Sequence, residues 1–100
     1  MVVRVLGDPA TVRALRLAGI DGRAVGPDTA EKAFEEELSS EGLGVLLVTE
    51  PVAAGIRRRV DAAKVSLHFP LVLEIPAMGV PSAPADDLVA KVARMIGIRG

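Results

Sequence analysis

Three short apolar runs divide the chain, and each borders on glycine or proline. They cover Val2 to Leu6, Leu43 to Val48 and Leu71 to Ile75. Their residues are apolar at both alternating positions, and many are β-branched, which is typical of strands in a parallel sheet that is covered on both faces. A shorter segment between two glycines, Arg23 to Val25, predicts a further strand at an edge of that sheet.

Between these runs the apolar residues change to helical spacing. Asp8 is a candidate N-cap, and Pro9 suits the first turn of a helix that buries Val12 and Leu15 on one face. Gly19 predicts the end of this first helix.

A second helix is predicted to begin at Asp28. The segment Asp28-Thr29-Ala30-Glu31 has the spacing of a capping box, in which the first acceptor and the glutamate satisfy backbone N–H groups. The side chains expected to be buried are those of Ala30, Ala33, Phe34 and Leu38, whereas Glu31, Glu35, Glu36 and Glu41 face water.

A third helix is predicted to begin at Thr49-Glu50-Pro51. Its apolar stripe consists of Val52, Ile56, Val60 and Ala63. The arginines from Arg57 to Arg59 fall mostly off this stripe. Such a run is typical of a solvated face, and binding of phosphate or of an acidic partner is the alternative.

Strands and helices therefore alternate, which predicts an α/β fold with a four-stranded, parallel, doubly wound sheet of the Rossmann-like or receiver-like kind. We assign residues 1–76 to this globular domain. The nine residues from Pro76 to Pro84 include three prolines and one glycine, which predicts a semi-extended linker over residues 77–85. Residues 86–100 form a C-terminal helix and tail.

The tail helix is predicted to be amphipathic, with an apolar face formed by Leu88, Val89, Val92, Met95 and Ile96. A helix from Asp86 to Ile96 is too short to be stable in isolation. Its apolar face must therefore dock, either on the parent sheet or on another protein.

Composition narrows the classes of function. With 100 residues, of which 50% are hydrophobic, and no cysteine, the chain is sized for one core without disulfides. A net charge of −1 and only two aromatic residues argue against nucleic-acid binding. The apolar runs are too short to insert into a membrane, and the N-terminus does not resemble a signal peptide. We expect a cytoplasmic protein.

The strand ends are the places to search for catalysis in such a fold. The first turn, VLGDPAT, lacks the glycines of a dinucleotide site, and no Walker motif is present. Asp8 and Glu50 follow neighbouring strands and are a candidate magnesium or acid–base pair, but both also suit helix caps, which we favour. His68 has no partner residue in the sequence and receives no role.

A receiver domain would need a phosphorylatable aspartate after the third strand and a lysine after the fourth. This chain has Thr49-Glu50 at the first position and no lysine at the second. We therefore expect no catalytic residue, metal or cofactor. A stand-alone receiver-like or flavodoxin-like module that binds a phosphorylated small molecule is the alternative function.

Several segments in the same order resemble the F subunit of the V/A-type rotary ATPases. They are VVRVLGDPATVRALRLAGI at the start, VLLVTEPVAAGIRRRVD, PLVLEIP and the closing ARMIGIRG. The family's Arg-Leu-Ala-Gly segment is Arg16-Leu17-Ala18-Gly19 here. One departure is Ala14-Leu15, where the family often has Gly-Phe.

The resemblance implies a non-catalytic central-stalk subunit of a proton- or sodium-translocating ATPase or ATP synthase. Such a subunit binds the coiled coil of the D subunit, reaches the ring of A and B subunits through its C-terminal helix, and regulates ATP hydrolysis. It would be peripheral to the membrane through the complex. Candidate partner-binding residues are Arg16, Leu17, Ala18, Gly19 and Ile20 in the first segment, and Val89, Val92, Met95 and Ile96 in the tail.

Leu17 decides how the first segment is interpreted. If the helix continues to this residue, Leu17 lies about 140° around the axis from Val12, which takes it away from the core stripe. It would then be exposed beside Arg16 and suited to an interface. If the helix unwinds before Gly19, Leu17 packs inward instead. The sequence leaves both open.

Overall fold

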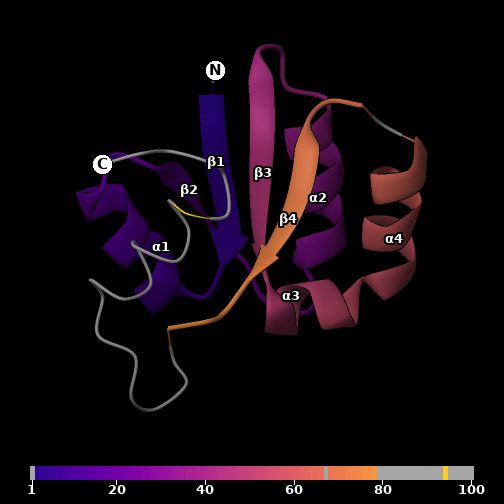
Figure 1. The fold of residues 1–100 in the computed structure, drawn as a ribbon. Coiled ribbons are helices and arrows are strands. Elements are labelled where there is room, and N and C mark those ends of the chain that lie inside the picture. Colours follow the sequence, from indigo (N-terminus) through magenta and orange to yellow (C-terminus); the bar gives the residue numbers. More distant parts are fainter. Residues whose placement is uncertain (1, 67, 79–93, 95–100) are drawn as a thin grey trace.

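The computed structural model describes residues 2–66, 68–78 and 94. Within them the chain forms a four-stranded, all-parallel sheet with the order β2-β1-β3-β4, interleaved with helices (Figure 1). The predicted fold class is confirmed. The elements are β1 (Val2–Gly7), α1 (Pro9–Leu17), β2 (Asp21–Ala24), α2 (Ala30–Leu38), β3 (Leu43–Thr49), α3 (Glu50–Gly55), α4 (Arg57–Ser66) and β4 (Leu71–Ile75).

The strand positions follow the apolar runs. β3 is central, and all seven of its residues are buried. β1 and β4 flank it, with Leu6 and Glu74 both opposite Val48 in register. The segment predicted as an edge strand is β2, which pairs only with β1 among the described strands and places Arg23 opposite Leu6.

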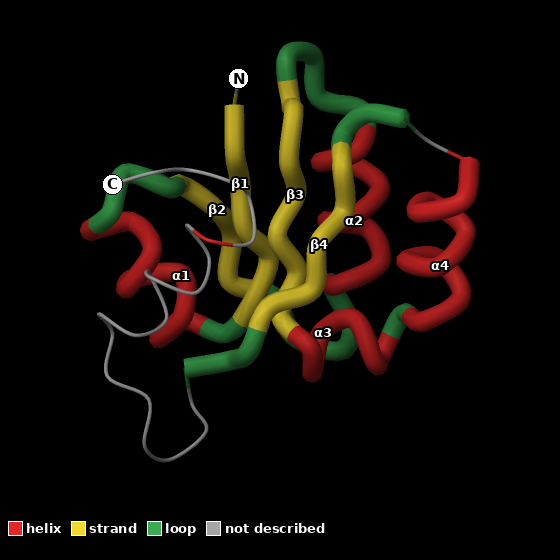
Figure 2. The backbone as a smooth tube through the Cα atoms, viewed as in Figure 1, coloured by secondary structure: helices red, strands yellow, loops and turns green. Residues whose placement is uncertain are grey.

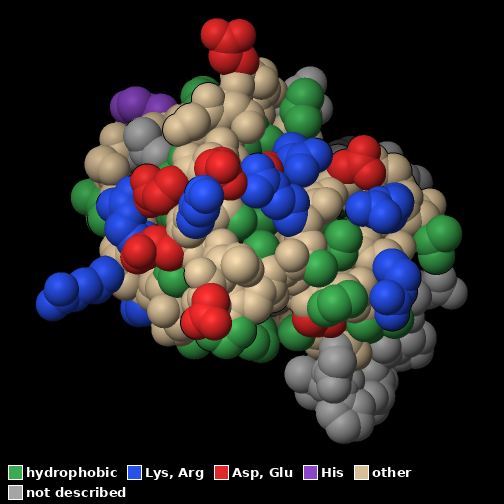
Figure 3. All heavy atoms as spheres, turned by 180° about the vertical axis from the view of Figure 1, so that it is seen from behind, with side chains coloured by type: hydrophobic (Ala, Val, Ile, Leu, Met, Phe, Trp, Pro, Cys, Tyr) green, Lys and Arg blue, Asp and Glu red, His purple; other side chains and the backbone are tan. Residues whose placement is uncertain are grey.

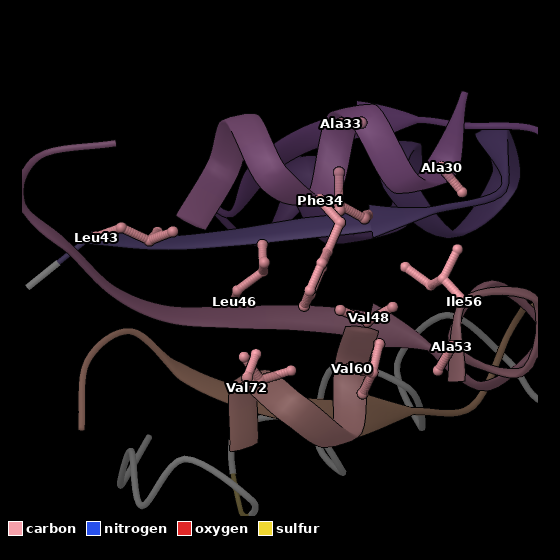
Figure 4. Close-up of a cluster of buried hydrophobic side chains, with 12 residues drawn as sticks. Ala30, Ala33, Phe34, Leu43, Leu46, Val48, Ala53, Ile56, Val60 and Val72 are labelled. Carbon is pink, nitrogen blue, oxygen red and sulfur yellow. The ribbon is translucent and has the colours of Figure 1, made fainter. Parts of the chain in front are cut away.

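The sheet separates two apolar cores, because successive side chains of a strand point to opposite faces. Figure 2 shows α1 on one side of the sheet and α2 and α4 on the other. Val5, Val45 and Leu47 face the α1 side, where Val12 and Leu15 pack on them. On the opposite side the strands contribute Leu6, Leu46, Val48 and Val72, and Phe34 points from α2 toward β3 (Figure 4).

The first predicted helix has the expected start. Asp8 is the N-cap of α1, and its carboxylate accepts hydrogen bonds from the backbone N–H of Thr11 at 3.1 Å and from the Thr11 hydroxyl at 2.6 Å. The helix continues to Leu17, and Gly19 follows with a φ of 88°, a left-handed conformation that glycine adopts without a steric penalty.

The predicted capping box at Asp28 is wrong. Asp28 lies in a turn in which the carbonyl of Gly26 accepts from Thr29 and Ala30, so α2 begins later than predicted. The Thr29 hydroxyl accepts from the N–H of Gly26 at 3.0 Å and therefore makes no capping bond to the helix.

The prediction of a single third helix is also wrong, because the structure divides this segment into α3 and α4 at Ile56. Gly55 has low helix propensity, and Ile56 leaves the helical region with a φ of −129° and a ψ of 37°. The break still buries Ile56 and Val60 on the sheet. Glu50 is not a cap, because Thr49 occupies the N-cap position and its side chain makes no capping bond.

The first residues of the expected linker contact the body. The N–H of Met78 donates to the hydroxyl of Thr11 at 2.8 Å, and the Met78 side chain packs against the core on the α1 side. The remaining linker residues, 79–85, lie outside the described residues, as does the predicted tail apart from Arg94.

Candidate docking surface

The last turn of α1 and the following turn, residues 16–20, form the surface that we call the α1 end. Leu17 is 89% exposed, which resolves the two possibilities for this residue: the helix continues to Leu17 and turns its side chain to solvent. Val12 and Leu15 are buried on the opposite side of the same helix. A large apolar side chain in open solvent is therefore held on a helix that the core fixes in place.

The turn after α1 is closed by backbone hydrogen bonds. The N–H groups of Ala18 and Ile20 donate to the carbonyl of Leu15, and that of Gly19 donates to Arg16, all at 3.0 Å. Ala18 and Gly19 are exposed, whereas Ile20 is half-buried and packs against the core on the α1 side. The structure thus brings four of the five predicted residues together on the surface and uses Ile20 partly as an anchor.

The predicted tail residues Val89, Val92, Met95 and Ile96 lie outside the described residues. Arg94 is helical and exposed. The role of these four apolar tail residues as a binding face stays a prediction.

A second group of exposed apolar side chains lies where α4 ends and β4 begins. Val65 is 89% exposed, Phe69 73% and Leu71 49%. Sequence reasoning missed this group. Val65 lies off the apolar stripe of its helix, and Phe69 is an aromatic residue in a loop, so both carried a usable signal. The second group and the α1 end are both at the amino-terminal end of the sheet.

The carboxyl ends of the strands border a hollow of about 510 Å³, and most of its lining is apolar. Asp8 and Thr49 are among the lining residues, but Glu50 is not, so the structure does not join the proposed carboxylate pair in this hollow. Nothing among the described residues forms a cluster of three or more His, Asp or Glu side chains that could hold a metal ion.

The carboxylate of Asp8 is already engaged. Burial of Asp8 on its own would raise its pKa, but the hydrogen bonds from the hydroxyl and N–H of Thr11 outweigh burial and lower the pKa below its usual value. Asp8 therefore acts as the ionised N-cap of α1.

Two of the three arginines in the run on α4 form ion pairs with carboxylates of the same chain. Arg57 makes a two-pronged ion pair with Glu74 at 2.6 and 2.8 Å, and Lys64 contacts the same carboxylate. The hydrogen bonds from Arg57 and Lys64 lower the pKa of Glu74 to about 2. Arg59 pairs with Glu35 of α2, and Arg58 is exposed. On this side of the molecule, acidic and basic side chains are interleaved (Figure 3).

Glu37 was not predicted to be buried, yet it is only 2% exposed. Its carboxylate contacts the guanidinium groups of Arg4 on β1 and of Arg23 on β2, the latter at 3.1 Å. A buried carboxylate needs such partners. This cluster fastens α2 to β1 and β2 at one edge of the sheet.

None of the helices in the described part of the chain is long and apolar enough to cross a membrane.

Comparison with known proteins gives a consistent result. The family model described as ATP synthase (F/14-kDa) subunit matches residues 3–92. The F subunit of the A-type ATP synthase of Methanothermobacter thermautotrophicus is 32% identical, and the match covers 96% of this chain and 92% of that protein. The F subunit of the V-type proton ATPase of Saccharomyces cerevisiae is 31% identical, with 95% and 92% covered. The corresponding V-type protein of Neosartorya fischeri is 36% identical, with 93% and 87% covered.

Proposed function

The chain belongs to the family of the ATP synthase (F/14-kDa) subunit and is an F subunit of the V/A-type ATPases, and from this premise we propose that it is a non-catalytic part of the central stalk. In this role it works by contact with larger subunits. The observation that carries the proposal is the solvent-facing Leu17 at the end of a helix whose other side is buried in the core.

The strand ends support a non-catalytic role. Asp8 is committed to Thr11, and Glu50 is exposed and does not line the hollow beside it. The geometry of the described residues therefore offers a docking surface and does not assemble an acid–base pair. The stand-alone module that binds a phosphorylated small molecule gains no support from this arrangement.

The proposed partner of the α1 end is the coiled coil of the D subunit. A coiled coil presents a straight helical surface, and the α1 end offers a short, rigid, partly apolar ridge formed by Arg16, Leu17, Ala18 and Gly19. The backbone hydrogen bonds of this turn hold the ridge in one conformation, which reduces the entropy lost on binding.

The proposed partners of the tail are the A and B subunits of the catalytic ring. In this proposal residues 1–76 are the body, residues 77–85 are the linker, and the helix in residues 86–100 regulates ATP hydrolysis. The hydrogen bond from Met78 to Thr11 shows that contacts of the body reach two residues past this proposed boundary. The protein would be peripheral to the membrane through the assembled ATPase.

Co-expression with the D subunit of the same organism tests the central proposal. A stable complex on size-exclusion chromatography, with a saturable isotherm by calorimetry, is expected. Separate elution together with the absence of measurable heat would refute it.

Deletion of residues 86–100 tests the tail. The truncated chain should keep its cooperative thermal transition and its binding to the D subunit, while ATP hydrolysis by the reconstituted motor changes.

A further inference from the structure

The solvent side of α1 carries basic and apolar residues together. With about 100° between successive residues of a helix, Arg13, Arg16 and Leu17 fall within an arc of about 100°. All three are exposed, and the buried residues Thr11, Val12, Ala14 and Leu15 occupy the other side of the helix. We call these three outward residues the α1 stripe.

The positive charge of the α1 stripe is largely uncompensated within the described structure. The sequence of α1, PATVRALRL, contains no acidic residue. Among the described residues, no carboxylate forms an ion pair with Arg13, and Arg16 has only Asp21 at 3.4 Å. The Arg16 and Asp21 side chains are 59% and 72% exposed, and such surface pairs contribute little stability. A partner's carboxylate can therefore replace Asp21 at small cost.

Most other described arginines are engaged. Arg4 and Arg23 contact Glu37, Arg57 contacts Glu74, and Arg59 contacts Glu35. On the side shown in Figure 3, over α2 and α4, charges of both signs alternate. The α1 stripe differs because it presents two arginines and a leucine without a neutralising carboxylate on its own helix. This asymmetry is local, since the net charge of the whole chain is only −1.

We propose that the α1 stripe binds an acidic, amphipathic helix, in which two carboxylates three or four residues apart flank an apolar side chain. Arg13 and Arg16 are separated by about 4.5 Å along the helix axis, which is similar to the spacing of residues three apart on a facing helix. Guanidinium groups pair with carboxylates through two parallel hydrogen bonds, and Leu17 would bury its side chain against the apolar residue of the partner.

This inference rests on the proposed function, because it names the chemistry of the surface on the D subunit that the α1 end contacts. It also adds Arg13 to the docking residues, which sequence reasoning had not selected. Because the contact combines exposed charges of opposite sign, its affinity and association rate should fall as salt is added.

The test uses the full chain and the intact D subunit, with affinity measured at low and at high salt. Double reversal by Arg13→Glu and Arg16→Glu should weaken binding at low salt by at least about 50-fold, because the new charges face carboxylates. It should also abolish the weakening by salt that the unmodified chain shows. Arg58→Glu on α4 is the matched control, because it changes an exposed arginine outside the α1 stripe, and it should leave affinity within about twofold.

Conversion of two acidic residues of the D subunit, spaced as proposed, to arginine should restore binding to the doubly reversed chain. Thermal unfolding monitors folding, and if the double reversal unfolds the protein, Arg13→Gln with Arg16→Gln replaces it and should still remove the salt dependence. Binding of the reversed or neutralised chain with unchanged affinity and salt response would overturn this inference and leave the proposed function standing. Failure of the unmodified chain to bind the D subunit would overturn both.

Discussion

The backbone N–H of Met78 donates a 2.8 Å hydrogen bond to the side-chain hydroxyl of Thr11, which lies 67 residues earlier in the chain. The same hydroxyl donates to the carboxylate of Asp8 at 2.6 Å. The inner side of α1 therefore anchors the segment that leads to the tail, while its outer side carries Leu17. One short helix therefore holds Met78 on its inner side and presents Leu17 on its outer side.

Replacement of Thr11 tests this connection. Thr11→Val keeps the shape of the side chain, but it removes the donor to Asp8 and the acceptor for Met78 within a fully buried site. We expect the free energy of unfolding to fall by about 1–3 kcal/mol, because the part-buried N–H of Met78 and the carboxylate of Asp8 each lose a hydrogen-bond partner. Urea denaturation measures the change. Thr11→Ser restores the hydroxyl and should recover most of the loss, and equal losses in both variants would assign the effect to packing.

Glu37 provides a test of the ion cluster beneath α2. Glu37→Gln keeps the size of the side chain but removes the charge that faces Arg4 and Arg23. The expected loss is about 1–3 kcal/mol of unfolding free energy, since hydrogen bonds to charged groups exceed neutral ones. Glu31→Gln is the control, because Glu31 is an exposed residue on the same helix and should be nearly silent. Similar values for the two variants would show that the cluster contributes no specific stability.

The ion pair between Glu74 and Arg57 should make stability depend on pH in the acidic range. The pKa of the Glu74 carboxyl is about 2 in the folded protein, against an ordinary value of 4.5, so unfolding takes up a proton between these two values. The pair therefore adds to stability above about pH 4.5, and this contribution disappears as the pH falls toward about 2.

The measurement compares the unmodified chain with Glu74→Gln across this range. The difference in midpoint of thermal unfolding should be largest at neutral pH and should shrink steadily below about pH 4.5. An NMR titration of the Glu74 carboxyl carbon gives the pKa directly. The prediction would be contradicted if the pKa of Glu74 were near its ordinary value. It would also be contradicted if the difference in unfolding midpoint between the two proteins were the same at every pH.

The sequence was sufficient for the sheet because strand identity depends on residue type along short runs. Leu43 to Val48 is apolar at every side-chain position, and the structure buries all of it. The start of α1 at Asp8 and Pro9 could also be predicted from the sequence, since an N-cap acts within one helical turn.

Features that depend on tertiary contacts were less accessible. Glu37 looks like another water-facing glutamate of α2 until Arg4 and Arg23 are brought beside it by strand pairing. The break at Ile56 was missed for another reason, since the periodicity of Val52, Ile56 and Val60 suits one straight helix equally well. Helical geometry showed that Leu17 would be exposed if the helix reached it, but only the structure shows that α1 ends at Leu17.

Leu17 and Val65 allow a matched test of which exposed apolar group docks on the coiled coil. Each is 89% exposed, each lies near the end of a helix, and they belong to helices on opposite sides of the sheet. Leu17→Ser and Val65→Ser should therefore both change the free energy of unfolding by less than about 0.5 kcal/mol. Any difference between the two variants in complex formation then reports on binding and not on folding.

We expect Leu17→Ser to weaken binding to the D subunit by roughly 30-fold, corresponding to about 2 kcal/mol for an apolar side chain that is buried in an interface. Val65→Ser should leave the affinity unchanged. Calorimetry or a surface-binding assay measures both. The reverse order would move the docking surface to the group formed by Val65, Phe69 and Leu71. Equal weakening would indicate a partner broad enough to cover the amino-terminal end of the sheet from α1 to α4, because exposed residues on opposite sides can respond together only if one surface contacts both.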